Sequence, residues 1–242
     1  MISVCMATYN GEAFIEAQLR SILASPRIDE VVVSDDDSSD ATLARIAALG
    51  DARVRVVAGP RAGLIRNFEN ALSQARGEVI FLSDQDDVWQ PQKVEVVLEA
   101  LIDADLVVTD CRVVDGDLHV VAPSFFRVHG SRPGFARNLL RNGYLGCCMA
   151  FRRSVLERAL PFPPALPMHD WWIGLVAERS VRVRFLDTPL TLYRRHDANA
   201  SSASERSRAS LRTRLRWRLS LLHALASRGL LWPGASTIAP KA

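Results

Sequence analysis

The sequence predicts an α/β fold whose central, mostly parallel sheet is flanked by helices. Three observations favour it: short continuous apolar runs recur, segments with helical spacing of apolar residues separate the early runs, and three polar clusters directly follow such runs. Continuous apolar runs are typical of parallel strands, which are buried on both faces. Ligands bind such sheets beyond the carboxyl ends of the strands, so the polar clusters are candidates for a site.

The order of elements follows from these runs. We expect strands at residues 2–6, 30–33, 54–57, 78–82 and 105–110, and helices at 12–23, 41–49 and 64–75. Later in the chain we expect an apolar segment at 143–151, a helix at 168–176 and two strands at 181–186 and 190–193. Composition then shifts to Ser, Ala and Arg. This shift predicts one domain over residues 1–201 and a basic helical tail over 202–242.

Bulk composition excludes several classes of protein. A net charge of +3 is too small to indicate nucleic-acid binding by itself. The four cysteines lack metal-site spacing, which favours free thiols in a reducing cytosol. The N-terminal residues lack the pattern of a signal peptide, and no apolar run approaches the roughly 20 residues that span a bilayer. We therefore expect a cytoplasmic protein.

The most informative cluster is Asp84-Gln85-Asp86-Asp87, which follows a very apolar run. Carboxylates crowded at a buried rim repel one another, so at least one pKa should rise unless a cation sits among them. Mg²⁺ or Mn²⁺ bridging a diphosphate would resolve this, because hard cations prefer carboxylate and phosphate oxygen. A solvated acidic turn before a helix near Pro91 is the alternative.

Two earlier clusters are open to two interpretations each. In the cluster after residue 33, a carboxylate could accept a hydrogen bond from a base or ribose, or Ser38, Ser39 or Asp40 could simply cap the next helix. Tyr9, in the turn after the first run, could stack on a pyrimidine or be a structural turn residue.

Two later residues are also ambiguous. Asp170 stands beside Trp171 and Trp172, where poor solvation would raise its pKa and suit it to act as a base. It could equally be an acidic helix cap. His196 could complete a metal or phosphate site, or be an ordinary packed residue.

Together the motifs resemble those of family 2 glycosyltransferases with the GT-A fold. The resemblance covers about residues 1–201 in the family's order and rests on VCMATYNG (4–11), DDDSSDAT (35–42), GLIRNFE (63–69), DQDDVW (84–89), GCCMAF (146–151), HDWW (169–172) and YRRHDAN (193–199). Each string is moderately specific, but seven in sequence are strong evidence. The third, fifth and sixth look most like the bacterial rhamnosyltransferase-like branch, which builds surface polysaccharide.

The resemblance implies donor contacts at four matching positions. Tyr9 and Asp36 would hold the pyrimidine base, Ala7 would contribute through its backbone, and Asn67 would also bind the donor. The donor would be dTDP-rhamnose, with UDP-hexoses as rivals. Family members commonly carry Gly where Asp37 stands; if the position needs a positive φ, Asp tolerates it better than most residues but worse than Gly.

The resemblance also implies the catalytic groups. Asp84 would contact the ribose or the metal, Asp86 would ligate a Mg²⁺ or Mn²⁺ that bridges the donor diphosphate, and His196 would approach the metal or the diphosphate. Asp170 would deprotonate the acceptor hydroxyl, which belongs to a carbohydrate or a lipid-linked saccharide. One base and a single displacement imply inversion at the anomeric carbon.

The tail has its own pattern. Leu211, Leu215, Leu219, Leu222 and Leu225 recur on one helical face, and seven arginines lie between Arg206 and Arg228. Such a basic amphipathic helix suits an anionic membrane surface. Alternatively, it packs on its own domain or on the second copy of a homodimer.

Two rival functions are weighed against sugar transfer. A non-catalytic sugar-nucleotide-binding relative that acts with a partner would not need Asp86 and Asp170, which are both present. A Mg²⁺-dependent phosphotransfer domain predicts a lysine near the acidic cluster, and the chain has only Lys93 and Lys241.

Overall fold

The computed structural model describes residues 1–196 and 210–231. In chain order the first elements are β1 (Ile2–Thr8), α1 (Ile15–Leu23), β2 (Glu30–Asp35), α2 (Thr42–Ala48), β3 (Val54–Ala58), α3 (Leu64–Gln74) and β4 (Val79–Ser83). The later elements are β5 (Val88–Trp89), α4 (Lys93–Ala100), β6 (Leu106–Val114), β7 (Val120–Ala122), α5 (Phe125–His129), α6 (Phe135–Leu140), η1 (Gly146–Cys148), β8 (Met149–Arg152), α7 (Arg153–Ala159), α8 (His169–Ser180), β9 (Val183–Arg194) and α9 (Leu211–Ser227).

One sheet runs through the molecule, in the order β3-β2-β1-β4-β8-β6-β9-β5, with β7 paired to β6. The first four strands are parallel, as the sequence predicts. In the second half, β8 is antiparallel to both β4 and β6, β9 is parallel to β6, and β5 is antiparallel to β9. The α/β fold is confirmed, and its sheet is parallel in the first half and mixed in the second.

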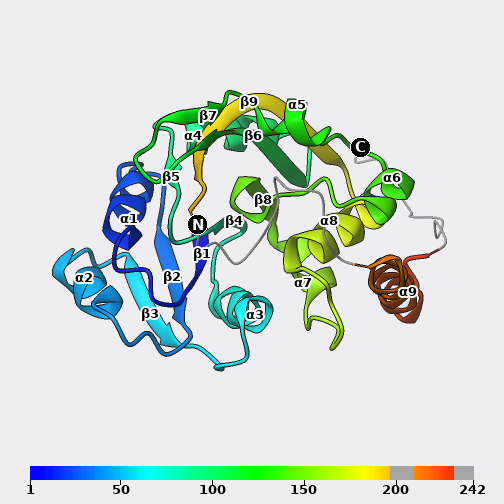
Figure 1. Ribbon diagram of the computed structural model, residues 1–242, viewed down its shortest axis with the longest axis horizontal. Coiled ribbons are helices and arrows are strands. Elements are labelled where there is room, and N and C mark those ends of the chain that lie inside the picture. Colours follow the sequence, from blue (N-terminus) through cyan, green and yellow to red (C-terminus); the bar gives the residue numbers. More distant parts are fainter. Residues whose placement is uncertain (197–209, 232–242) are drawn as a thin grey trace, which may run out of the picture.

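Helices cover both faces of this sheet (Figure 1). The alternation of side chains along β1 shows the two layers. Val4 and Met6 pack in a core cluster with residues of α1, α2 and α4, whereas Cys5 and Ala7 pack in a second cluster with residues of α3, α7 and α8. A strand buried on both faces favours apolar residues on both sides, which explains the apolar run, and its buried Ser3 and Thr8 hydroxyls donate to the carboxylates of Glu30 and Asp35.

Two expected late strands form one strand. Residues 181–186 and 190–193 were expected to be separate, but β9 runs continuously from Val183 to Arg194. The pairing of β9 with β6 shifts register between Leu186 and Pro189. A bulge tolerates proline, which has no N–H for the ladder, so the break in the sequence pattern marks an irregularity within the strand and not its end.

The helical part of the tail packs on the domain. Leu221, Ala224 and Leu225 of α9 are buried in the cluster beneath α7 and α8. The expected domain boundary at residues 201 and 202 lies outside the described residues, as does the end of the YRRHDAN string. Among the described residues, no helix has the length and apolarity to cross a membrane.

Candidate active site

The turn after β1 forms one wall of the candidate site. Ala7 is buried near the end of the strand, and the side chain of Tyr9 is 59% exposed at the edge of the cavity. The Tyr9 N–H donates to Gln85 Oε1 at 3.0 Å, and Gln85 Nε2 donates to the Tyr9 carbonyl at 3.2 Å. This exchange ties the turn after β1 to the acidic turn after β4.

Asp36 lies directly after β2 and organises the loop that leads to α3. Its Oδ1 accepts from the Arg61 N–H at 2.6 Å, and its Oδ2 from the Gly63 N–H at 3.0 Å. Each carboxylate oxygen has a second lone pair, so Asp36 keeps acceptor capacity for a ligand. Asn67 lies beside it on α3: its Nδ2 donates to the Thr8 carbonyl at 3.1 Å, while its buried Oδ1 has no hydrogen-bond partner among the described residues.

Asp37 adopts the left-handed backbone conformation, with φ 74°. The position where family members commonly carry Gly therefore does need a positive φ. Asp is among the residues that tolerate it, because its short polar side chain can hydrogen-bond locally. Here Asp37 Oδ1 pairs with the Arg61 guanidinium at 2.8 Å. The turn thus keeps its geometry without glycine.

The acidic turn after β4 shows the predicted repulsion between carboxylates. Burial and the neighbouring Asp86 charge raise the pKa of Asp84 to about 8. The same two causes raise the pKa of the fully buried Asp87. Asp87 serves the fold, because its Oδ1 accepts from the Arg194 N–H at 3.0 Å and so ties the end of β9 to this turn.

Asp86 lies against His196, the other residue predicted to approach a metal. The His196 Nε2 lies 2.9 Å from Asp86 Oδ2, and its ring stacks on Phe14 with 4.7 Å between centroids. These residues are 110 positions apart in the chain. The end of β9 brings them together.

The chemistry of this edge fits a hard divalent cation. Asp84 and Asp86 offer carboxylate oxygens and His196 offers an imidazole nitrogen. Burial and then the Asp86 charge raise the pKa of Asp84, and a cation would offset both by stabilising the carboxylate. Asp84 and Asp87 also lie near the Cys147 thiol, within a ligand-atom grouping of 4.8 Å. Burial raises the pKa of that thiol, so it is a poor ligand for a hard cation at neutral pH.

Asp170 stands on the opposite wall, in the first turn of α8. Its Oδ1 accepts from the Trp171 N–H at 2.5 Å and from Asn142 Nδ2 at 3.2 Å, and its Oδ2 accepts from the Gly146 N–H at 3.1 Å. Burial raises its pKa to about 6. Three of about four acceptor positions are thus filled, and one remains for a hydroxyl proton.

The neighbouring Trp171 and Trp172 are buried, and their indole N–H groups donate to the Asn138 and Ala159 carbonyls at 2.6 and 2.9 Å. They provide the poorly solvating surroundings expected from the sequence. The alternative of a helix cap is not observed, because the N-cap residue of α8 is Met168 and makes no side-chain capping bond.

His169 is a further polar group on this wall. Its ring stacks on Phe68 with 4.0 Å between centroids, and neither ring nitrogen has a hydrogen-bond partner among the described residues. Burial lowers its pKa to about 3, so the imidazole is neutral. Gly146 leaves room for it, since a Cβ there would lie 3.1 Å from His169 Nε2.

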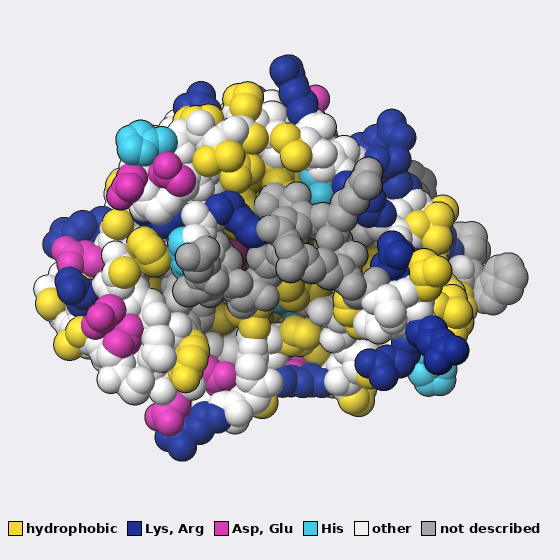
Figure 2. All heavy atoms as spheres, in the orientation of Figure 1, with side chains coloured by type: hydrophobic (Ala, Val, Ile, Leu, Met, Phe, Trp, Pro, Cys, Tyr) yellow, Lys and Arg dark blue, Asp and Glu magenta, His cyan; other side chains and the backbone are white. Residues whose placement is uncertain are grey.

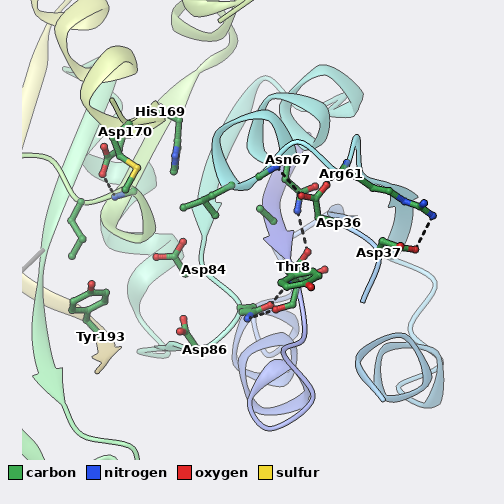
Figure 3. Close-up of a pocket in the computed structure, with 18 residues that line it drawn as sticks. Thr8, Asp36, Asp37, Arg61, Asn67, Asp84, Asp86, His169, Asp170 and Tyr193 are labelled. Atoms are coloured by element: carbon green, nitrogen blue, oxygen red, sulfur yellow. Dashed lines mark hydrogen bonds and ion pairs between the residues drawn. The ribbon is translucent and has the colours of Figure 1, made fainter. Parts of the chain in front are cut away.

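One cavity of about 540 Å³ joins these groups. Figure 3 shows Asp36 and Asn67 on one side, Asp84 and Asp86 below, and His169 and Asp170 on the other side. Seven of the eight residues expected at the site line this cavity: Ala7, Tyr9, Asp36, Asn67, Asp84, Asp86 and Asp170. His196 joins the site through Asp86.

Five contributors to the site were not singled out from the sequence: Arg61, Gln85, Asn142, Gly146 and His169. Gln85, Gly146 and His169 lie within the recognised strings, so their position was a usable signal. Arg61 and Asn142 lie outside them, and nothing local indicates their role. Their hydrogen bonds to Asp36 and Asp170 form only when distant segments meet.

Sequence comparison finds glycosyltransferases. The chain is 27% identical over 228 residues to an uncharacterised glycosyltransferase of Nostoc sp., covering 86% of this chain and 70% of the relative. It is 26% identical to a UDP-Glc:α-D-GlcNAc-diphosphoundecaprenol β-1,3-glucosyltransferase of Escherichia coli, covering 75% and 72%. It is 25% identical to a dTDP-rhamnosyl transferase of Shigella flexneri, covering 82% and 74%.

Solved structures share the fold. TarS residues 1–349 of S. aureus, in complex with UDP-GlcNAc, superpose with a TM-score of 0.70 at 22% identity, over 91% of this chain and 66% of that chain. Glucosyl-3-phosphoglycerate synthase of Mycobacterium tuberculosis, in complex with Mn²⁺, UDP and phosphoglyceric acid, has a TM-score of 0.58 at 23% identity, over 94% and 78%.

The model of the family described as "Glycosyl transferase family 2" matches residues 3–160, which is more than half of the chain. That stretch contains the ends of β1 and β2 and the acidic turn, and the resemblance seen in the motifs continues beyond it to Asp170 and His196. The chain belongs to glycosyl transferase family 2.

Proposed function

We propose that this protein is an inverting, metal-dependent glycosyltransferase that moves a sugar from a nucleotide diphosphate to an acceptor hydroxyl. The observation that carries the proposal is the position of Asp170 across one cavity from Asp84 and Asp86. A buried carboxylate with one open acceptor position faces a cluster of carboxylates suited to a cation. The cavity would thus hold the proton acceptor, Asp170, on one wall and the diphosphate of the donor on the other.

The nucleotide would lie along the wall formed by the ends of β1 and β2. Tyr9 presents an exposed ring on which a pyrimidine can stack, and Asp36 keeps lone pairs for the base. Asn67 Oδ1, buried without a partner, would accept a hydrogen bond from the donor. The wall therefore offers stacking and hydrogen-bond acceptors to one planar group.

The reaction would be a single displacement. Asp170 takes the proton of the acceptor hydroxyl as its oxygen attacks the anomeric carbon, and the bond from that carbon to the diphosphate oxygen breaks on the opposite face. Asp86, His196 and Asp84 would hold a divalent cation, which would balance the charge of the departing nucleoside diphosphate. The configuration at the anomeric carbon is inverted, since only one displacement occurs.

The proposed donor is dTDP-rhamnose or a UDP-hexose, and the proposed process is surface polysaccharide synthesis. The names of the E. coli and S. flexneri relatives support both donors. Phosphotransfer finds no such support: Lys93 is buried, and its Nζ donates to the Cys147 carbonyl at 2.7 Å and to Thr191 Oγ1 at 2.8 Å. Its ammonium group thus serves the fold.

Thermal unfolding with dTDP, UDP and GDP, each with and without Mn²⁺, tests the proposal. We expect a Mn²⁺-dependent rise in Tm with dTDP or UDP, because a ligand at one hundred times its Kd stabilises the folded state by about 2.7 kcal/mol. Asp86→Ala should abolish the Mn²⁺-dependent part. Asp115→Ala is the matched control, since Asp115 belongs to a second grouping of metal-type residues, with Asp117 and His119, that does not line the cavity.

The outcomes separate the alternatives. No Tm rise with any nucleotide would contradict the proposal and favour a protein that depends on a partner. A rise without any sugar transfer would favour the non-catalytic binding relative. Loss of the rise in Asp115→Ala as well would mean that Mn²⁺ acts elsewhere.

A further inference from the structure

The helix α9 is firmly docked along one side and exposed along another. Leu221 and Leu225 are fully buried, and the guanidinium of Arg179 donates to the Leu230 and Leu231 carbonyls at 2.9 Å each. Arg228 lies over the Trp172 ring, 5.1 Å from its centroid. The orientation of α9 is therefore set by packing, and its outer face is a defined surface.

That outer face is apolar along its first half. Leu211, Leu215 and Leu219 are 76%, 58% and 57% exposed. Their spacing of four residues places them on one side of the helix. Large apolar residues so exposed, and so regularly placed, are unusual on a soluble surface unless something covers them.

A fourth apolar residue extends this surface beyond α9. Leu140, at the end of α6, is 62% exposed, and its carbonyl accepts a hydrogen bond from the guanidinium of Arg218 on α9. We call Leu140, Leu211, Leu215 and Leu219 the α9 face. The bond from Arg218 to the Leu140 carbonyl places Leu140 next to α9, so the face includes residues far apart in the sequence.

Arginines flank the α9 face. Arg212 and Arg216 are exposed and follow Leu211 and Leu215 directly, and Arg141 is exposed next to Leu140. No Asp or Glu occurs anywhere in residues 206–242. Figure 2 shows apolar and basic side chains side by side over α9, at the right of the view. Positive charge around exposed leucines complements a surface that is both apolar and anionic.

We propose that the α9 face docks on an anionic lipid surface. Leucines would enter the boundary between headgroups and acyl chains, and the arginines would meet lipid phosphates. α9 would lie in the plane of the interface, as an amphipathic helix does. A second protein copy fits less well, because two such faces would bring like charges together.

The location of the α9 face relative to the cavity gives this docking a use. Leu140 is two residues from Asn142, whose Nδ2 donates to Asp170 Oδ1 at 3.2 Å. Docking would therefore hold the Asp170 side of the cavity near the bilayer, where an acceptor carried on a lipid would present its hydroxyl. This last point rests on the proposed function; the docking itself does not.

Co-sedimentation with vesicles tests the docking with the full chain. We expect binding to vesicles of equal parts phosphatidylglycerol and phosphatidylcholine, weak binding to phosphatidylcholine alone, and weakening by salt. Each Arg→Gln change at Arg212 or Arg216 should lower the partition coefficient about fivefold. The double change Leu215→Ser with Leu219→Ser should lower it by about tenfold or more.

Ile102→Ser is the matched control, since Ile102 is 71% exposed and lies outside the α9 face. It should bind vesicles like the unchanged protein. A fluorophore on Leu140→Cys should shift to the blue on vesicle binding, whereas one on Ile102→Cys should not. Labelling is selective because all four native thiols are buried.

Equal vesicle binding by the double leucine variant and the unchanged protein would overturn the proposal. A dimer in solution that the double leucine variant converts to monomer, without vesicle binding by either, would instead assign the face to a second copy. The Mn²⁺-dependent Tm rise with nucleotide should be the same in all these variants. Failure of the docking is thereby distinguished from failure of the proposed function.

Discussion

The groups that surround Asp170 explain why its carboxylate would act as a base, which its position in a motif does not. Three donors hold the carboxylate, and each comes from a different segment: its own helix, Asn142 after α6, and Gly146 in η1. Burial nevertheless raises its pKa to about 6, so desolvation outweighs these hydrogen bonds. The result is an oriented carboxylate that is ionised near neutrality and still basic enough to accept a proton.

Transfer should therefore depend on the ionisation of Asp170. We expect kcat/KM to fall about tenfold per pH unit below about pH 6, because the protonated carboxyl cannot accept the hydroxyl proton. A cation bound near Asp84 would move this midpoint to lower pH, since it favours the carboxylate. Steady-state rates measured across this pH range would check it.

Asp170→Asn should lower the rate by about 10²–10⁴-fold and leave the Tm rise with nucleotide intact. Asp187→Asn is the control, because Asp187 is an exposed carboxylate on β9. Transfer by Asp170→Asn at the unchanged rate would show that another group is the base.

At the scale of elements, α9 shows how one helix can have two apolar faces with different roles. Spacing alone places Leu225 on the same stripe as Leu211, yet Leu225 is buried and Leu211 is 76% exposed. Trp217 is partly buried against the domain and full burial begins at Leu221, whereas Leu211, Leu215 and Leu219 project outward from the other side of the helix. The expectation of packing on its own domain is correct for one face only.

Unfolding by denaturant should separate these two faces. Leu221→Ala should lower the free energy of unfolding by about 2–5 kcal/mol, since a fully buried leucine leaves a cavity when truncated. Leu219→Ala, two positions earlier, should change it by less than about 0.5 kcal/mol, because Leu219 is 57% exposed. Equal losses would mean that the outer face is covered within the protein itself.

At the scale of the whole molecule, the cavity lies where two halves of the sheet meet. The parallel half supplies Ala7, Asp36 and the acidic turn, and helix α8, which packs on the sheet, supplies Asp170. β9 closes the site, because its end contacts Asp87 and leads to His196 beside Asp86. The site thus forms only when the sheet is complete. The carboxylates of Asp84, Asp86 and Asp87 then stand at one buried edge, where their charges repel.

That charge should make stability depend on pH and metal together. The folded pKa of Asp84, about 8, lies above its unfolded value, so its contribution to stability is present below the unfolded pKa and is lost as pH rises towards 8. A bound cation removes this loss by stabilising the carboxylate. The rise in Tm on adding Mn²⁺ should therefore be larger at about pH 8 than at about pH 6.5.

His169 does not contribute to the pH dependence of stability between about pH 6.5 and pH 8. Its pKa is depressed, so it lowers the stability only as pH falls below its ordinary pKa near 6.5. The pKa of Asp87 is also raised, so Asp87, like Asp84, lowers the stability of the metal-free protein as pH rises. Asp84→Asn should flatten the dependence of the metal-free Tm on pH. If the rise in Tm with Mn²⁺ were the same at both pH values, the cluster of carboxylates around Asp84 would not be the cause of that rise.

The sequence by itself determined the α/β class, the order of the first strands and helices, and seven cavity-lining residues. The class and the order of elements follow from the apolar period, and the strand-end polar clusters indicated where a site would lie; Ala7 and Asn67 came only from the resemblance of short motifs to a known family. It also indicated that Asp37 occupies a turn suited to glycine, and the φ of 74° agrees.

Only the tertiary structure decided how the second half of the sheet pairs, which face of α9 is buried, and what surrounds each carboxylate. Register and strand direction depend on partners far along the chain, as in the bond between Asp86 and His196 across 110 positions. A pKa likewise depends on burial and nearby charge, so the same residue type is ordinary or perturbed according to what folds against it. Local sequence encodes which groups are present; their distances, and hence their chemistry, arise only when the sheet is complete.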